Sequence, residues 1–130
     1  MKFAKIVFLV AGVYGLVVVT PLFFLEGAID AMQPPTITHP EYYYGFACVT
    51  LVWQILFLVL ARDPLRYRPM MLMAALEKVS GLAFILLVLL HRSPPTLLIG
   101  AVDMGLGIFF LIAYARTAPG GVQQAAAVHS

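Results

Sequence analysis

Long apolar stretches alternate with short polar stretches along this chain of 130 residues. Four of the apolar stretches approach the roughly 20 residues that a helix needs to cross about 30 Å of hydrocarbon. Prolines and charged residues lie between these stretches, where helices commonly end. The pattern predicts four helices, at approximately residues 3–25, 42–61, 70–91 and 95–114.

The connections after the second and third predicted helices are short. Short connections force neighbouring helices to be antiparallel, so we expect an all-α, integral membrane four-helix bundle of up-down-up-down topology. This domain would cover residues 1–115. Residues 116–130 are small and polar with no apolar period, and we predict a disordered cytoplasmic tail there.

The first apolar stretch follows Lys2 and Lys5, an arrangement that a secretory signal peptide also shows. The apolar region of a signal peptide has about 7 to 15 residues, whereas this stretch continues for roughly 20. No convincing cleavage site of small residues follows it. We therefore predict a retained membrane helix.

Composition supports the membrane class and excludes several functions. With 62% hydrophobic residues, 11% charged residues and a mean hydropathy of +0.97, the chain has too little polar material to coat a soluble domain. The net charge of +2 comes without clusters of basic and aromatic residues, which argues against a nucleic-acid partner. The single cysteine, Cys48, excludes an internal disulfide and a CxxC thiol relay.

The basic residues are distributed unequally between the two sides of the predicted bundle. Under the positive-inside rule, the richer side faces the cytoplasm. This predicts a multi-pass protein of the bacterial inner membrane with both termini in the cytoplasm. The richer side carries Lys2, Lys5, Arg62, Arg66, Arg68 and Arg116, and the other side carries Arg92.

Polar residues inside the apolar stretches are the best indication of a site. Glu77 and Lys78 are adjacent in the middle of the third stretch, although a charge at the centre of a membrane helix costs about 2.5 to 3.5 kcal/mol. At about 1.5 Å of rise per residue, Gln54, Asp103 and Tyr14 come close to the same depth. We predict that these five residues form a polar cluster near the midplane and bind a ligand.

Helical phase places polar and small residues on the same helix faces. Small residues allow close approach of helix backbones, so these faces are expected to point into the bundle. The faces comprise Ala11 and Gly15 on the first helix, Ala47, Thr50, Gln54 and Ala61 on the second, Glu77, Ser80, Gly81, Phe84, Val88 and His91 on the third, and Gly100, Asp103 and Gly107 on the fourth.

The arrangement of charges within the cluster leaves two interpretations open. Lys78 lies about 100° around the helix from Glu77, so the two are not expected to face each other, and Asp103 is the expected partner of the ammonium. Alternatively, Lys78 reaches toward the cytoplasmic interface. A pair of Lys78 with Asp103, with Gln54 or Tyr14 donating to Glu77, would lock the helices in register. The same residues would equally serve as a functional site.

The histidines give no support for a cofactor. His39 and His91 lie near one surface with Glu26 and Glu41, but the HxxH and HExxH spacings of metal sites are absent. A haem would require histidines on facing helices inside the bundle. We therefore predict no metal and no other cofactor.

Several segments resemble a known group of proteins. They are WQILF at 53–57, RDPLRYRPMM at 62–71, Glu77 with Lys78, Asp103, and FFLIAYART at 109–117. Together they resemble the small uncharacterised bacterial membrane proteins of four helices, broadly DoxX-like. The resemblance implies a membrane location and a helical bundle, and it implies no reaction and no catalytic residues.

The sequence favours a non-enzymatic role: an accessory or lipophile-binding membrane protein, with membrane lipid, a lipophilic small molecule or a second copy of the chain as partners. One alternative is a small enzyme for a lipophilic substrate, with Glu77 as proton donor and Asp103 or Lys78 stabilising charge. Another alternative is an oligomeric proton-coupled transporter. A transporter would need a water path from the cluster to a surface.

Overall fold

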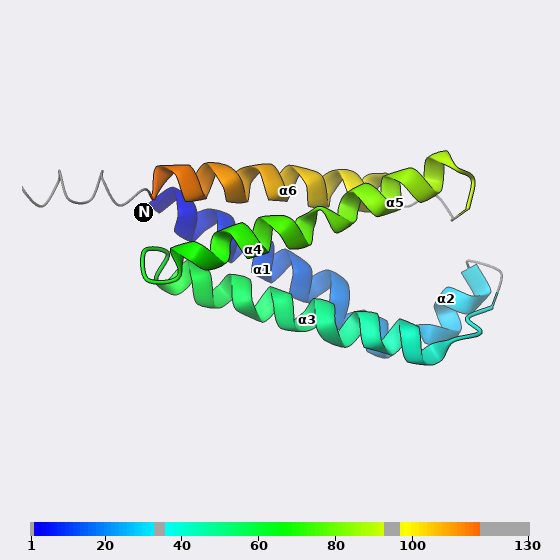
Figure 1. Ribbon diagram of the computed structural model, residues 1–130. Coiled ribbons are helices and arrows are strands. Elements are labelled where there is room, and N and C mark those ends of the chain that lie inside the picture. The colour runs from blue at the N-terminus through cyan, green and yellow to red at the C-terminus, as the bar shows by residue number, and fades with distance from the viewer. Residues whose placement is uncertain (1, 33–35, 93–96, 118–130) are drawn as a thin grey trace, which may run out of the picture.

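The computed structural model describes residues 2–32, 36–92 and 97–117, and all regular secondary structure in these ranges is helical (Figure 1). The elements are α1 (Lys2–Val19), a 3-10 helix (Thr20–Phe23), α2 (Glu26–Met32), α3 (Pro40–Arg62), α4 (Arg68–Lys78), α5 (Ser80–Leu89) and α6 (Leu97–Arg116).

Within residues 2–32, 36–92 and 97–117, four helical segments are long and apolar enough to cross a membrane. This confirms the predicted number of such segments. Their bounds differ from the predicted ones by only a few residues at each end. The segments are Lys2–Phe23, Pro40–Arg62, Arg68–Leu89 and Leu97–Arg116.

The third segment is two helices and not the single continuous helix predicted for residues 70–91. The regular helix pattern is interrupted at Val79, between α4 and α5. The Val79 N–H donates to the Leu76 carbonyl at 3.1 Å, and the Val79 carbonyl accepts from the Leu82 N–H at 2.9 Å. Both bonds span three residues, which tightens the turn relative to an α-helix. Val79 itself keeps right-handed helical backbone angles, so the chain tightens at this point without leaving the helical course.

The first segment also ends differently from the prediction. Regular α-helix stops at Val19, because Pro21 has no N–H to donate and its ring crowds the preceding turn. The short helix α2, which the sequence did not predict, follows. Acidic side chains hold this region in place: Glu26 accepts from the Tyr44 hydroxyl at 2.7 Å and Asp30 accepts from the Ile37 N–H at 2.6 Å.

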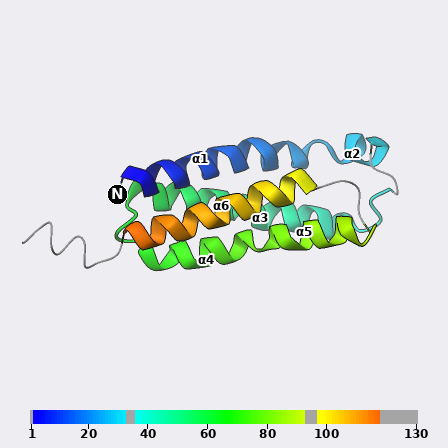
Figure 2. The same cartoon turned by 90° about the horizontal axis from the view of Figure 1, so that it is seen from above.

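The helices associate as two pairs. α1 packs chiefly on α3, and both α4 and α5 pack chiefly on α6, while contacts of α6 with α1 and of α4 with α3 join the pairs. Figure 2 shows α6 lying alongside α4 and α5, with α1 on its other side. α5 therefore depends on α6 for most of its support.

Glycines allow the helices of each pair to approach closely. A Cβ atom added to Gly81 would lie 2.7 Å from the Gly100 carbonyl oxygen, and one added to Gly100 would lie 2.7 Å from the Gly81 carbonyl oxygen. In the other pair, a Cβ atom on Gly12 would lie 2.7 Å from Leu58 Cδ2. Small residues at such crossings are the common way for helices to associate in lipid, where burial of apolar surface gives little drive.

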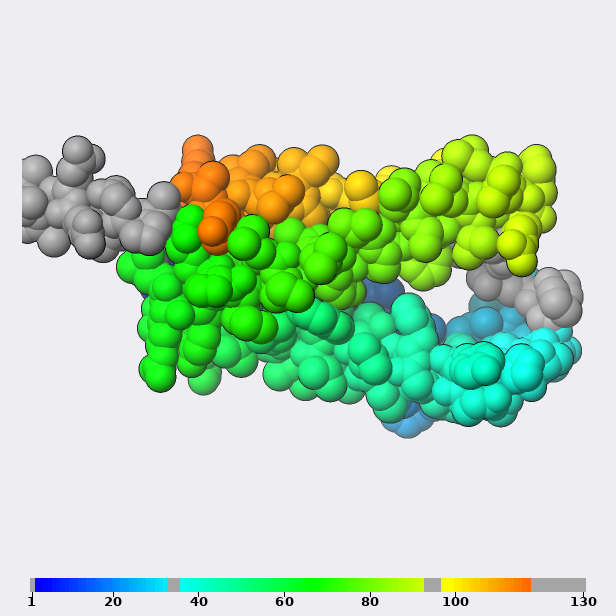
Figure 3. Space-filling view, in the orientation of Figure 1, coloured from blue at the N-terminus to red at the C-terminus, as the bar shows by residue number. Residues whose placement is uncertain are grey.

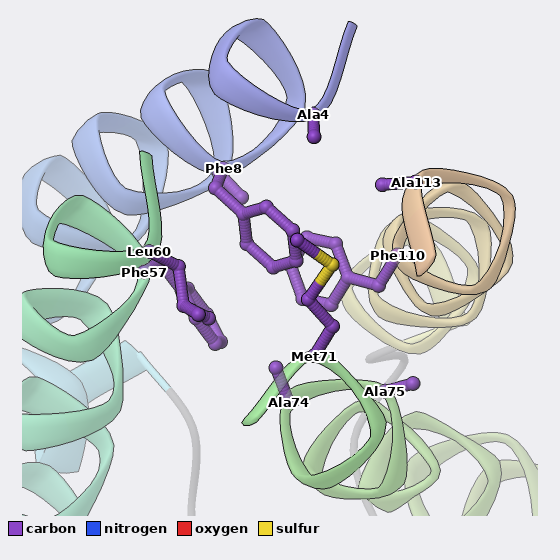
Figure 4. Packing of buried hydrophobic residues seen from close by; sticks show 10 residues of the cluster. Ala4, Phe8, Phe57, Leu60, Met71, Ala74, Ala75, Phe110 and Ala113 are labelled. Atoms are coloured by element: carbon purple, nitrogen blue, oxygen red, sulfur yellow. The ribbon is translucent and has the colours of Figure 1, made fainter. Parts of the chain in front are cut away.

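A core of buried apolar side chains joins the two pairs at one end of the molecule (Figure 4). The Phe8 and Phe110 rings stack with centroids 4.4 Å apart, and the Phe57 ring meets the Phe110 ring edge-on at 5.0 Å. The residues of this core cluster are Ala4, Phe8, Ala11, Phe57, Leu60, Met71, Ala74, Ala75, Phe110 and Ala113.

Basic side chains fasten the helix ends beside the core cluster. The Arg68 guanidinium lies 3.7 Å above the Tyr114 ring and donates to the Tyr114 carbonyl at 3.1 Å, near the end of α6. Thr117 is buried, and its hydroxyl donates to the Ala113 carbonyl at 2.9 Å. Arg116 and Thr117 of the predicted tail are thus ordered against the bundle, and residues 118–130 of that prediction lie outside the described residues.

Candidate functional site

Away from the core cluster, the two helix pairs diverge around a cavity of about 400 Å³. Figure 3 shows the surface hollowed between α5 and α3, toward the end of the molecule that carries α2. The cavity walls are mainly apolar, with side chains from both helix pairs and from the region of α2. The apolar lining includes Val18, Val19, Leu22, Ile29, Ile37, Phe46, Phe84 and Ile99.

All five residues of the predicted polar cluster line this cavity. They come from four helices: Tyr14 from α1, Gln54 from α3, Glu77 and Lys78 from α4, and Asp103 from α6. Depth and phase along separate helices thus indicated a spatial group correctly. We call these five residues the polar floor, because they lie at the end of the cavity nearer the core cluster.

Lys78 lies between the two carboxylates of the polar floor. Its Nζ atom is 3.4 Å from Asp103 Oδ1 and 3.5 Å from Glu77 Oε2. The expected contact with Asp103 is present, but the expectation that Glu77 and Lys78 do not face each other is wrong. Lys78 ends α4, and its long, flexible stem lets the ammonium reach both acids.

The surroundings of Lys78 also exclude the alternative in which it extends to the interface. The residue is only 5% exposed, and its Nζ atom lies 5.0 Å from the centroid of the Phe57 ring. An ammonium over an aromatic face is attracted by the electron-rich ring. Lys78 therefore bridges the polar floor and the core cluster.

The polar floor contains two buried acceptor atoms without a hydrogen-bond partner in the described part of the chain: Gln54 Oε1 and Glu77 Oε2. The Glu77 oxygen is close enough to Lys78 for ionic attraction but does not accept a hydrogen bond from it. Neither Gln54 nor Tyr14 donates to Glu77 as expected. The Gln54 amide donates instead to the Thr50 carbonyl, one turn earlier in α3, at 2.9 Å.

Gly15 provides the space that Gln54 occupies. A Cβ atom added to Gly15 would coincide with the Gln54 amide, whose Oε1 and Cδ atoms are its nearest neighbours. The sequence indicated Gly15 as a small residue on an inward face, and the structure shows which side chain it accommodates. Gln54 can therefore lie buried across α1 only because residue 15 has no side chain.

Two residues predicted on the polar face of the third helix do not join the polar floor. Ser80 and His91 are exposed and do not line the cavity. The helix face counted from Glu77 nevertheless continues across Val79, because Gly81 is buried and Phe84 lines the cavity together with Glu77. Ser80 lies at the edge of this face, and His91 lies beyond the end of α5. His91 has a φ of 54° at the end of α5, where the chain leaves the helix.

Most of the apolar wall was not identified from the sequence, although Phe84 was predicted on the same helix face as Glu77 and does line the cavity. Phe46 and Ile99 look like any other apolar residue in a membrane helix, and only their positions around the diverging pairs distinguish them. Ile29 and Ile37 flank the segment between α2 and α3, whose course was not predicted. No local signal in the sequence indicates that the helix pairs diverge.

A second hollow lies between α1 and α3 at the end with the core cluster. It has a volume of about 530 Å³ and is lined by Lys5 and Arg62 with apolar residues including Leu9 and Ile55. It is larger but more open than the cavity over the polar floor. The buried, unpartnered acceptors lie at the other cavity, which is therefore the candidate site.

The described residues show no group of three or more His, Cys, Asp or Glu side chains that could hold a metal ion. His39 Nδ1 lies 3.1 Å from Glu41 Oε1, and both side chains are largely exposed. The chemistry available at the candidate site is therefore that of its carboxylates, ammonium, amide and phenol.

The chain matches no family model, no curated protein and no solved structure. The resemblance to DoxX-like proteins stays a prediction from the sequence. Interpretation of the site therefore depends on its own geometry.

Proposed function

We propose that the protein is a multi-pass protein of the bacterial inner membrane, with up-down-up-down helices and both termini in the cytoplasm. Four helices of spanning length support insertion. The start of α1, the connection from α3 to α4 and the end of α6 lie at the same end of the molecule (Figure 1). Six of the basic residues named above belong to these segments, which supports the orientation.

We further propose that the protein binds a lipophilic molecule, either a membrane lipid or a lipophilic small molecule, in the cavity above the polar floor. The observation that carries this proposal is the combination of apolar walls with a few convergent polar groups at one end. Ligand sites characteristically have this composition, and a volume of about 400 Å³ falls within their usual range.

The position of the cavity also suits a ligand that arrives from the bilayer. The hollow lies between α3 and α5, because α5 packs chiefly on α6 and not across the bundle. In a membrane, this side of the bundle would face acyl chains. A lipophilic molecule could then enter sideways without crossing water.

A direct test is mass spectrometry of lipophilic molecules that stay bound to the purified protein. Thr50 lines the cavity on α3, whereas Val52 on the same helix is exposed and lines neither hollow. We expect Thr50→Phe to lower the amount of bound molecule about tenfold, because the ring fills cavity space. Val52→Phe is the matched control and should leave the bound amount unchanged. Equal retention by both variants would contradict the proposal.

A second candidate function is supported by Glu77, a residue of the cavity lining whose buried carboxyl oxygen Oε2 has no hydrogen-bond partner among the described residues. In this role Glu77 would donate a proton to a lipophilic substrate, and Lys78 or Asp103 would stabilise the charge that develops. Glu77→Gln would then retain a bound molecule of different mass from that retained by the native protein, because substrate would accumulate. Identical bound molecules would leave binding as the function.

The transport hypothesis would require a change of conformation. We call the end of the molecule with the start of α1, the connection from α3 to α4 and the end of α6 the basic end. Phe8, Phe57 and Phe110 are fully buried between the cavity and this end. A proton path across the molecule would need this core cluster to part in a second state.

A further inference from the structure

We propose that the ligand of this cavity is a lipophilic amine, held at the polar floor through its protonated nitrogen. This inference rests on the proposed binding of a lipophilic molecule and specifies the chemistry of its head group. Both acceptor atoms, Gln54 Oε1 and Glu77 Oε2, are almost inaccessible, so these side chains would rotate toward the cavity to accept hydrogen bonds from the nitrogen. The apolar body would extend between the two helix pairs toward the mouth of the cavity.

Two buried acceptor atoms of the polar floor lack a hydrogen-bond donor. Gln54 is only 2% exposed, yet its Oε1 atom has no partner in the described protein. Glu77 Oε2 also accepts no hydrogen bond there and has only the ionic contact with Lys78 at 3.5 Å. Leaving a buried acceptor unsatisfied is costly, so such atoms in a native structure need an explanation. A ligand that brings hydrogen-bond donors would satisfy both.

The orientation of the Gln54 amide follows from its neighbour. The amide nitrogen donates to the Thr50 carbonyl oxygen, an atom that can only accept. Exchanging the amide oxygen and nitrogen would bring two acceptors together there. The atom left without a partner is therefore the oxygen, which lies against Gly15, another residue of the cavity lining. An additional hydrogen-bond donor is needed to satisfy it.

The donors of the polar floor are already engaged. The Lys78 ammonium lies against Asp103 and Glu77, and the Gln54 nitrogen is bound to Thr50. The Tyr14 hydroxyl can either donate or accept, and this residue is 38% exposed. A carboxylate or phosphate head would therefore meet mainly acceptors at the floor.

The polar floor has more acidic than basic groups. Two carboxyl groups and one ammonium are in contact there, and with both carboxyl groups ionised the formal charge is minus one. A charge in surroundings of low polarity is stabilised by a partner of opposite sign. In a lipophilic ligand, the head group is the part that can carry this opposite charge. A positive head balances the floor, and a negative head would be repelled.

The experiment compares three probes that share a twelve-carbon chain and differ in the head group: dodecylamine, dodecanol and dodecanoate. The protein is reconstituted in lipid nanodiscs at neutral pH, where the amine is protonated and the carboxylate is ionised. Mass spectrometry measures the amount of each probe retained. We expect about tenfold more amine than alcohol, because hydrogen bonds to charged groups are the stronger ones, and least dodecanoate.

Variants assign the preference to the polar floor. Glu77→Gln should bring amine retention down to the level of the alcohol, and Gln54→Met should lower retention of both. Glu41→Gln changes an exposed acid outside the cavity and should leave all three amounts unchanged. Amine retention that stays at the native level in both floor variants would overturn the assignment.

The outcomes separate this inference from the proposed function. Equal retention of the three probes, or a preference for dodecanoate, would overturn the amine inference while lipophile binding stands. If the native protein retains none of the probes and carries no lipophilic molecule after purification, the proposed function itself fails. The comparison in native protein needs no variant, so a floor variant that does not fold would not prevent the test.

Discussion

The two ends of the bundle are packed in different ways. At the basic end, aromatic rings from α1, α3 and α6 meet in the core cluster, and side chains from all four membrane-length segments fill the space. At the other end, the same helices form two separate pairs with the cavity between them. The polar floor lies at the boundary, with Lys78 touching both regions.

The difference shows that close packing within each pair does not require close packing of the whole bundle. Gly81 and Gly100 hold α5 on α6, and Gly12 and Gly15 hold α1 near α3. Among the described residues, the contacts between aromatic rings of different pairs lie at the basic end. Stability and binding are therefore expected to depend on different residues of the same helices.

The largest effect should come from the core cluster. Phe110→Ala removes a fully buried ring and should lower the free energy of unfolding by about 3 to 5 kcal/mol. Ile99→Ala, on the same helix at the cavity, should cost about 0.5 kcal/mol or little more, because Ile99 is 44% exposed. Thermal unfolding in detergent measures both. Similar losses for the two variants would break the distinction between the ends.

A smaller effect should come from the boundary. Lys78→Met leaves Glu77 and Asp103 without their shared cation, and we expect a loss of about 3 kcal/mol, the lower part of the range for removing one partner of a buried pair. Adding Glu77→Gln and Asp103→Asn to this variant should recover most of the loss. Lys5→Met, at an exposed position, is the control. Native stability of the Lys78 variant, measured by the same unfolding assay, would show that the ions are not coupled.

The third test concerns Gly15, the glycine that makes room for Gln54 at the cavity. Gly15→Ala forces the Gln54 amide to move and should cost about 1 to 3 kcal/mol, as overpacking commonly does. It should also reduce binding of a lipophilic probe, because Gln54 belongs to the polar floor. Gly105→Ala meets open space on α6 and should be neutral or stabilising by up to about 1 kcal/mol. Unfolding and probe retention are measured on both variants.

The sequence predicted the helices and the polar floor for the same physical reason. A membrane helix makes every polar residue conspicuous, and depth and phase then place it in space. Gln54, Glu77 and Asp103 could be assigned to one layer without any knowledge of tertiary contacts. The pairing of Lys78 with both acids needed the actual path of its side chain.

The interruption at Val79 could not be predicted, because neither glycine nor proline lies between Leu76 and Ser80. It coincides with the point where α5 follows α6 through the close approach of Gly81 to Gly100, which is a tertiary effect. The cavity forms where the two helix pairs diverge, and no local signal in the sequence predicted this divergence.

The adjacency of Glu77 and Lys78 has a consequence for the order of assembly. A chain made from its N-terminus presents α4 and α5 before α6 exists, so Asp103 is not yet available to Lys78. Until α6 is made, Glu77 is the carboxylate that lies in the same helix as the Lys78 ammonium. In the proposed membrane setting, this neighbour lowers the cost of bringing Lys78 into the bilayer until the last helix arrives.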